Sequence, residues 1–166
     1  MTTTPDYRPT DILPAACPLT IICGPPGSGK TTWARAHRYE TADIIIDLDE
    51  IQAAMDDYTD AKLAESITIR NALLRELSTV TSPAAWFIVG APRHQERMHW
   101  RKTLQPSRLI VLEVSPVECC KRIDADKGHH VKKYQRKSYA HLWWERYTRD
   151  PDDEIQYNKD NQEPTA

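Results

Sequence analysis

Residues 24–31 read Gly-Pro-Pro-Gly-Ser-Gly-Lys-Thr and meet every fixed position of the phosphate-binding loop pattern. The glycines permit the tight turn that directs successive backbone N–H groups at phosphate oxygens. Lys30 would place its charge on the β- and γ-phosphates of ATP, and the Thr31 hydroxyl would ligate Mg²⁺. The residues expected to contact the nucleotide are Gly24, Pro25, Pro26, Gly27, Ser28, Gly29, Lys30, Thr31 and Thr32.

Two carboxylates, Asp47 and Asp49, follow the second apolar run of the chain at residues 43–46. In a parallel sheet they would lie at the same edge as the phosphate loop. A carboxylate there could accept the proton of an attacking hydroxyl or help to hold Mg²⁺. We predict Asp47 as a metal residue together with Thr31, and the alternative is that one of the two carboxylates only caps the next helix.

Basic residues are concentrated in the segment 121–137, which has seven of them against Asp124 and Asp126. The segment follows the fourth predicted strand and one helix, where small phosphotransferases carry a mobile lid. Cations in a lid would neutralise charge on the transferring phosphoryl group, and closure would exclude water. We therefore predict a basic lid at about residues 124–137, with a solvated basic face as the alternative.

The third predicted strand, residues 85–89, is followed by Gly90. An aspartate that positions Mg²⁺ is common at this point in related sites. Without it, Thr31 would depend on the carboxylates after the second strand. Arg93 and Arg97 come shortly after Gly90 and are predicted to bind substrate phosphates.

These residues need a strand before the phosphate loop, a helix after it and further strands beside it. Apolar runs and helical patterns alternate along the chain as this requires. The alternation predicts an α/β chain with the three-layer P-loop NTPase fold, in which a mostly parallel sheet carries helices on both faces. Strands are expected at 19–23, 43–46, 85–89 and 108–114, and helices at 30–39, after 47 to about 57, at 61–80, 94–104, from 115 to about 123, and at 137–147.

The length of 166 residues fits one domain, with an extended arm over 1–16, a P-loop kinase-like domain over 17–149 and a disordered tail over 150–166. The tail has six acidic residues against one lysine. No apolar run approaches the roughly 18 residues that a membrane-spanning helix needs. The four cysteines form no Cys-x-x-Cys motif. We therefore expect a cytoplasmic protein with reduced thiols.

Two runs resemble the 5′-kinase domain of phage-type polynucleotide kinases. Residues 27–35 read GSGKTTWAR, and residues 49–55 read DEIQAAM. The resemblance covers roughly residues 19–147, and the wider relatives are small P-loop kinases of the AAA_33-like type. It implies that Lys30 and Thr31 bind phosphate and Mg²⁺.

The resemblance also implies that Asp49 is the general base, which activates the acceptor hydroxyl, and that Arg122 and Lys127 are lid cations. The family pattern has an arginine three residues after the base, where this chain has Gln52, and an aspartate where it has Gly90. We expect Gln52 at the acceptor, with a lost contact to the acceptor phosphate or a different acceptor.

The leading hypothesis is an ATP-dependent phosphotransferase that moves the γ-phosphate to a hydroxyl, with the 5′-hydroxyl of a nucleic acid or nucleotide as the acceptor. The alternative is an ATP-binding or ATPase accessory protein of phage DNA processing or packaging, with weak or no kinase activity. Gly90 favours this alternative, and the basic segment would then bind DNA in a salt-dependent way. The acceptor, the choice of ATP over GTP and the oligomeric state stay open.

Overall fold

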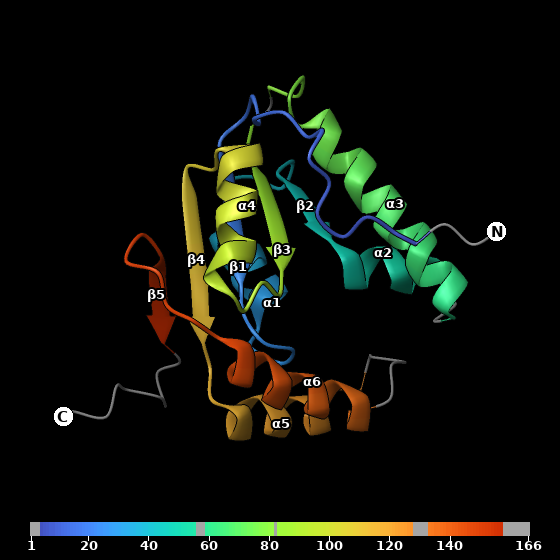
Figure 1. The fold of residues 1–166 in the computed structure, drawn as a ribbon, viewed down its shortest axis with the longest axis vertical. Helices are drawn as coiled ribbons and strands as arrows, with labels where there is room; N and C mark the ends of the chain where they lie inside the picture. The colour runs from blue at the N-terminus through green and yellow to red at the C-terminus, as the bar shows by residue number, and fades with distance from the viewer. Residues whose placement is uncertain (1–3, 56–58, 82, 128–132, 158–166) are drawn as a thin grey trace.

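A computed structural model describes residues 4–55, 59–81, 83–127 and 133–157 (Figure 1). A five-stranded sheet has the order β2-β3-β1-β4-β5, and every neighbouring pair of strands is parallel. This arrangement confirms the predicted α/β class with a parallel sheet. The elements are β1 (Leu19–Cys23), α1 (Lys30–His37), β2 (Ile44–Asp47), α2 (Leu48–Met55), α3 (Asp60–Glu76), β3 (Ala85–Val89), α4 (His94–Leu104), β4 (Arg108–Glu113), α5 (Pro116–Ala125), α6 (Lys133–Arg146) and β5 (Glu154–Tyr157).

The central strand β1 is buried at all five positions, because helices cover both faces of the sheet. Side chains alternate between those faces. Ile21 and Cys23 join the core that contains Trp100 of α4, while Ile22 joins the core that contains Ala34 of α1. The strand that carries the phosphate loop is thereby fixed from both sides.

The carboxyl ends of the strands all point toward α5 and α6 (Figure 1). The phosphate loop leaves β1 at this edge, and α2 begins directly after β2. Two glycines of the loop have positive φ, 80° at Gly27 and 85° at Gly29. A Cβ on Gly27 would also lie 2.7 Å from the Cys119 carbonyl oxygen of α5, so the loop needs glycine there for both reasons.

The predicted disordered tail is wrong for its first part, because residues 150–157 belong to the folded domain. Glu154–Tyr157 forms β5 and pairs with β4. Two acidic residues of this segment are counter-ions of arginines: Asp153 pairs with Arg97 at 2.9 Å, and Glu154 with Arg108 at 2.6 Å. Residues 158–166 lie outside the described residues, so the rest of the predicted tail stays a prediction.

The predicted arm is extended but packed against the domain. Arg70 and Asn71 of α3 donate to the backbone carbonyls of Tyr7 and Asp6, at 2.8 and 2.7 Å. Ile12 of the arm lies in the core with the side chains of α3 and α4. The arm therefore covers the sheet face opposite α1.

The predicted lid is largely helical, because α6 begins at Lys133 rather than at 137, and α5 and α6 lie side by side (Figure 1). Trp143 Nε1 donates to the Gly90 carbonyl at 2.8 Å, and Trp144 Nε1 donates to the Val114 carbonyl at 2.9 Å. The second half of α6 is thus fixed to the ends of β3 and β4. Lid residues 128–132 lie outside the described residues. Within the described parts of the chain, no helix has the length and apolar character needed to cross a membrane.

Candidate active site

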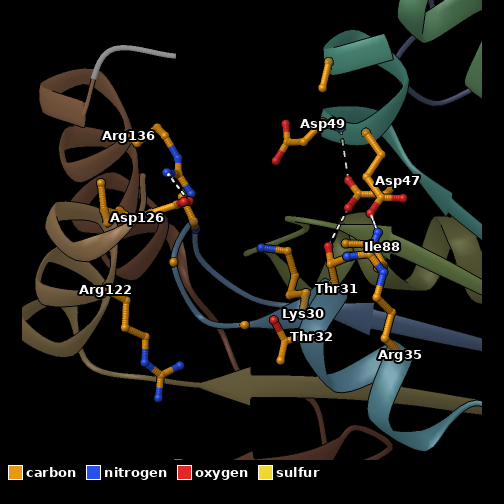
Figure 2. A pocket seen from close by; sticks show the side chains of 16 residues that line it. Lys30, Thr31, Thr32, Arg35, Asp47, Asp49, Ile88, Arg122, Asp126 and Arg136 are labelled. Atoms are coloured by element: carbon orange, nitrogen blue, oxygen red, sulfur yellow. Dashed lines mark hydrogen bonds and ion pairs between the residues drawn. The ribbon is translucent and has the colours of Figure 1, made fainter. Parts of the chain in front are cut away.

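A cavity of about 430 Å³ opens at the carboxyl edge of the sheet, between the phosphate loop, α2 and the helix pair α5–α6 (Figure 2). Loop residues form its floor. Carboxylates from β2 and α2 line one wall, and arginines from α5 and α6 line the other. The cavity therefore brings together elements that are far apart in the sequence. The loop residues that line it are Pro26, Gly27, Gly29, Lys30, Thr31 and Thr32.

Lys30 is the first residue of α1, and its side chain lies between the two walls of the cavity (Figure 2). Its Nζ donates to the carbonyls of Gly24 and Pro25, at 3.0 and 2.9 Å. Burial lowers the pKa of Lys30, and the nearby charges of Asp49 and Asp47 oppose that shift. The lysine is thus held against the loop by carbonyls alone, with carboxylates close enough to act on its charge.

Asp47 ends β2 and lies between Thr31 and Asp49. The Thr31 hydroxyl donates to Asp47 Oδ2 at 2.5 Å, and the Asp49 backbone N–H donates to Asp47 Oδ1 at 3.0 Å. The pKa of the Asp47 carboxyl is raised by its burial and by the charge of Asp49, while the bond from Thr31 opposes this. Asp47 is therefore occupied on both oxygens.

Asp49 lies in the first turn of α2 with its side chain in the cavity (Figure 2). Within the described residues, its carboxylate accepts no hydrogen bond. The other carboxylates of the cavity are engaged: Asp47 as above, Glu50 by Arg35, and Asp126 by Arg136. Among the described residues, Asp49 is thus the carboxylate of this cavity with neither oxygen engaged in a hydrogen bond.

Arg122 of α5 contacts the phosphate loop directly. Its Nη1 donates to the Ser28 carbonyl at 3.0 Å, and its Nε donates to Glu118 at 3.1 Å. Arg136 of α6 also lines the cavity and pairs with Asp126 at 3.4 Å. The sequence analysis did not single out Arg136 within the basic segment. Lys127 follows α5, is exposed and does not line the cavity.

The three residues predicted to bind substrate do not line the cavity. Gln52 faces inward from α2 and is 9% exposed. Arg97 is fully buried, pairs with Asp153 and donates to the carbonyls of Ala91, Pro92 and Thr148, so it stabilises the fold and cannot reach a substrate. Arg93 is exposed, and it precedes α4 and pairs with Glu96 at 3.7 Å.

Arg35 and Glu50 line the cavity and were missed by the sequence analysis. Arg35 lies one helical turn after Thr31, and Glu50 directly follows Asp49. Arg35 could have been found from its spacing to Thr31, because side chains four positions apart share a helix face, whereas the spacing of Glu50 to Asp49 gives no such signal. Their hydrogen bond, from Arg35 Nη2 to Glu50 Oε1, joins α1 to α2.

A second cavity, of about 550 Å³, adjoins the phosphate loop at Ser28 and Gly29. It shares Gly29, Thr32 and Arg122 with the first cavity, so the two are neighbours. Trp33 and His37 of α1 line it and stack with ring centroids 3.7 Å apart. Its other lining residues are Ser28, Ala36, Leu112, Val114, Gln156 and Tyr157.

Gly90, at the end of β3, carries no side chain into the cavity. Its carbonyl accepts from the Trp143 indole and, at 3.3 Å, from the Gly24 backbone N–H. A Cβ at this position would meet Trp143 Cδ1 at 3.9 Å, an ordinary contact distance. Neither space nor backbone conformation therefore requires glycine here.

The predicted Mg²⁺ site fits the oxygen donors that the cavity offers. Magnesium binds through one or two protein oxygens together with phosphate oxygens and water. The Thr31 hydroxyl and the Asp47 carboxylate lie together next to the loop. Within the described residues, no group of three or more His, Cys, Asp or Glu side chains is arranged to hold a metal. The ion would thus depend on Thr31, Asp47 and the nucleotide.

Comparison with known proteins gives one family and several similar structures. The model of the AAA_33 family, an AAA domain, matches residues 19–148. A gluconokinase from Sinorhizobium meliloti 1021 has a TM-score of 0.56 and 14% identity over 86% of this chain and 83% of its own. Shikimate kinase from Bacteroides thetaiotaomicron has a TM-score of 0.52 and 17% identity over 77% of this chain and 78% of its own.

A chain of the Pnkp1/Rnl/Hen1 RNA repair complex has a TM-score of 0.55 and 20% identity over 84% of this chain and 48% of its own. At such identities the likeness shows a shared fold alone, which agrees with the P-loop NTPase fold predicted from the sequence. A search of curated proteins finds no significant match.

Proposed function

The chain belongs to the AAA_33 family of AAA domains, and from this premise we propose that it is an ATP-dependent phosphotransferase. It would move the γ-phosphate of ATP to a hydroxyl. The observation that carries the proposal is the position of Asp49, whose unengaged carboxylate lies in one cavity with Lys30 and Thr31. A kinase needs a base that can accept a proton from the attacking hydroxyl, whereas simple nucleotide binding does not.

The cations around the loop support charge stabilisation during transfer. Lys30 would exchange its two loop carbonyls for phosphate oxygens, because charge-assisted bonds to phosphate are the stronger ones. Arg122 and Arg136 line the opposite wall and would neutralise charge on the transferring group. Mg²⁺ held by Thr31 and Asp47 would supply further neutralisation of the phosphates.

The second cavity would receive the nucleoside of ATP. It adjoins the phosphate loop and shares three residues with the first cavity. The stacked rings of Trp33 and His37 offer a flat surface for a base, since aromatic stacking tolerates any base. Arg122 lines both cavities and would thus contact both ends of the nucleotide.

The acceptor we propose is the 5′-hydroxyl of a nucleic acid or nucleotide. The runs at residues 27–35 and 49–55 support this, together with the fold shared with a chain of an RNA repair complex. Lys121 on α5 and Lys127, which follows α5, are exposed and could attract a phosphate backbone.

A second candidate is an accessory protein that binds ATP and hydrolyses it slowly. Gly90 favours it, because β3 brings no carboxylate to the cavity to help orient the metal or a water. A single assay separates the candidates. The protein is incubated with γ-labelled ATP, Mg²⁺ and a panel of 5′-hydroxyl oligonucleotides, nucleosides and nucleoside monophosphates. Label on an acceptor supports the kinase, and label released only as free phosphate supports the accessory protein.

Asp49→Asn should lower the transfer rate by about 10²–10⁴-fold, which is the usual contribution of a positioned base. ATP affinity should stay within about threefold of the wild type, since within the described residues the Asp49 carboxylate forms no hydrogen bond to the phosphate loop. The matched control is Glu76→Gln, which neutralises an exposed carboxylate at the end of α3. An Asp49→Asn enzyme with full transfer activity would remove this residue from the mechanism.

A further inference from the structure

Building on the proposed phosphotransferase function but narrowing its acceptor to a nucleoside without a 3′-phosphate, we propose that Arg35 and Glu50 form the acceptor-recognition pair and bind the hydroxyls of a neutral sugar rather than a phosphate. The reacting hydroxyl would lie at Asp49, and neighbouring hydroxyls of the same sugar would lie at Arg35 and Glu50. In this assignment the acceptor wall of the cavity consists of Arg35, Asp47, Asp49 and Glu50. It takes the place of the residues that the sequence predicted to bind the substrate.

The pair is placed where an acceptor has to lie. Glu50 is next to the proposed base Asp49 in the first turn of α2. Arg35 lies one turn along α1 from Thr31, and its guanidinium reaches across to α2 (Figure 2). Both residues line the cavity, and Arg35 lies on the side away from Arg122 (Figure 2). A sugar bound here would thus lie on the Asp49 side of the phosphate loop.

The pair keeps unused hydrogen-bonding capacity. The side chains of Arg35 and Glu50 are 57% and 39% exposed, so a ligand can reach both. Their contact uses one N–H of the guanidinium and one oxygen of the carboxylate. The remaining N–H groups can donate, and the remaining lone pairs can accept. Adjacent sugar hydroxyls match this arrangement because each can do both, whereas a phosphate dianion only accepts and would leave Glu50 unmatched.

The charge of this wall also disfavours an anion. Three carboxylates line it, those of Asp47, Asp49 and Glu50. Among the described lining residues of α1 and α2, the cations are Arg35 and Lys30, and Lys30 lies at the phosphate loop. Burial raises the pKa of Glu50, and the charges of Asp47 and Asp49 add to this shift, while Arg35 opposes it. A phosphate next to the reacting hydroxyl would add repulsion here, and a neutral sugar would not.

The position at which the resembling family has a phosphate-binding arginine adds no cation to the acceptor wall of this chain. Gln52 is buried and does not line the cavity, while Ala53, which does, carries no charge. Within the described residues, the acceptor wall therefore has no cation that is free of a carboxylate partner.

The test compares three acceptors that differ by one chemical feature. Adenosine is neutral, adenosine 3′-monophosphate adds an anion, and 2′,3′-dideoxyadenosine removes the hydroxyls that the pair would bind. Transfer from labelled ATP gives kcat/KM for each. We expect adenosine to equal or exceed the 3′-monophosphate, and the dideoxynucleoside to fall by about tenfold or more, the usual effect of losing hydrogen bonds to charged groups.

Arg35→Gln and Glu50→Gln should each lower kcat/KM for adenosine by about tenfold and leave the dideoxynucleoside and the affinity for ATP unchanged. The matched control is Arg38→Gln, an exposed arginine just beyond the end of α1. A purely structural pair would instead lower the rates with all acceptors, and that result overturns the proposal.

A 3′-phosphate that raises kcat/KM by about tenfold, with the gain lost in Arg35→Gln, would make the pair a phosphate reader and would also overturn the proposal. Equal rates for adenosine and the dideoxynucleoside count against it in the same way. These outcomes all include transfer, so they leave the proposed function intact. Absence of transfer to every acceptor overturns the proposed function itself, and the acceptor assignment with it.

Discussion

Asp153 is fully buried between two arginines, and Asp153→Asn measures how much this cluster stabilises the domain. One carboxylate oxygen accepts from Arg97 at 2.9 Å and the other from Arg101 at 2.8 Å. The Arg97 side chain is 0% exposed, so the substitution leaves a buried guanidinium without a carboxylate. Removing one partner of such a pair costs about 3–5 kcal/mol.

The asparagine oxygen can still accept one hydrogen bond, and Arg101 is partly exposed, so we expect the lower end of that range, about 3 kcal/mol. For a domain of this size, this corresponds to a fall in Tm of roughly 6–12 °C. The free energy of unfolding is measured by urea denaturation at pH 7, followed by circular dichroism. Asp152→Asn is the control and should change stability by less than about 0.5 kcal/mol, because Arg101 uses only the backbone carbonyl of Asp152.

A loss below about 1 kcal/mol in Asp153→Asn would refute the reasoning, since that value is typical of an exposed ion pair. If the variant does not fold, the double variant Arg97→Met/Asp153→Leu still tests it. The double variant removes both charges and should be more stable than Asp153→Asn alone, because no unpaired charge remains buried.

Two further predictions concern single side chains. Cys120 has the partly exposed thiol and should react with a disulfide reagent within minutes. The other three cysteines are buried and should react only after unfolding; burial raises the pKa of Cys23 to about 12. A second thiol that reacts within minutes would contradict the burial of these three cysteines. Burial, reinforced by the charge of Arg8, lowers the pKa of His99. At pH values below about 6.5, unfolding therefore takes up a proton at His99, and the free energy of unfolding should fall as the pH drops. His99→Phe should flatten the plot of urea midpoint against pH between about pH 7 and 5, and an unchanged plot would refute this.

Local patterns were sufficient to predict the parts of the fold that surround the phosphate loop. β1 and β3 match their predicted bounds, because each is a short apolar run in a sheet covered on both faces. β5 could not be predicted in the same way. Three of its four residues are only partly buried and Tyr157 is exposed, and the acidic residues around them are typical of a disordered segment. The arginines that neutralise those acids lie on α4 and β4, far away in the sequence.

The residues of the candidate site also divide into those that local motifs predict and those that depend on contacts with distant segments. Lys30, Thr31, Asp47 and Asp49 follow from motifs within a few residues, and the structure brings them into one cavity. Arg97 was assigned to substrate because charge alone does not reveal whether a helix residue faces solvent or the core. That information resides in the packing of α4 against the segment after α6.

The pairing of Arg97 with Asp153 has a consequence for synthesis on the ribosome. The two residues are 56 positions apart, so α4 leaves the ribosome well before its counter-ion does. Until then the guanidinium needs water, and α4 cannot bury that face. The outer edge of β4 also stays open until β5 arrives, and open strand edges promote association between chains. We expect the nascent chain to complete its core late, and to depend on chaperones during that interval.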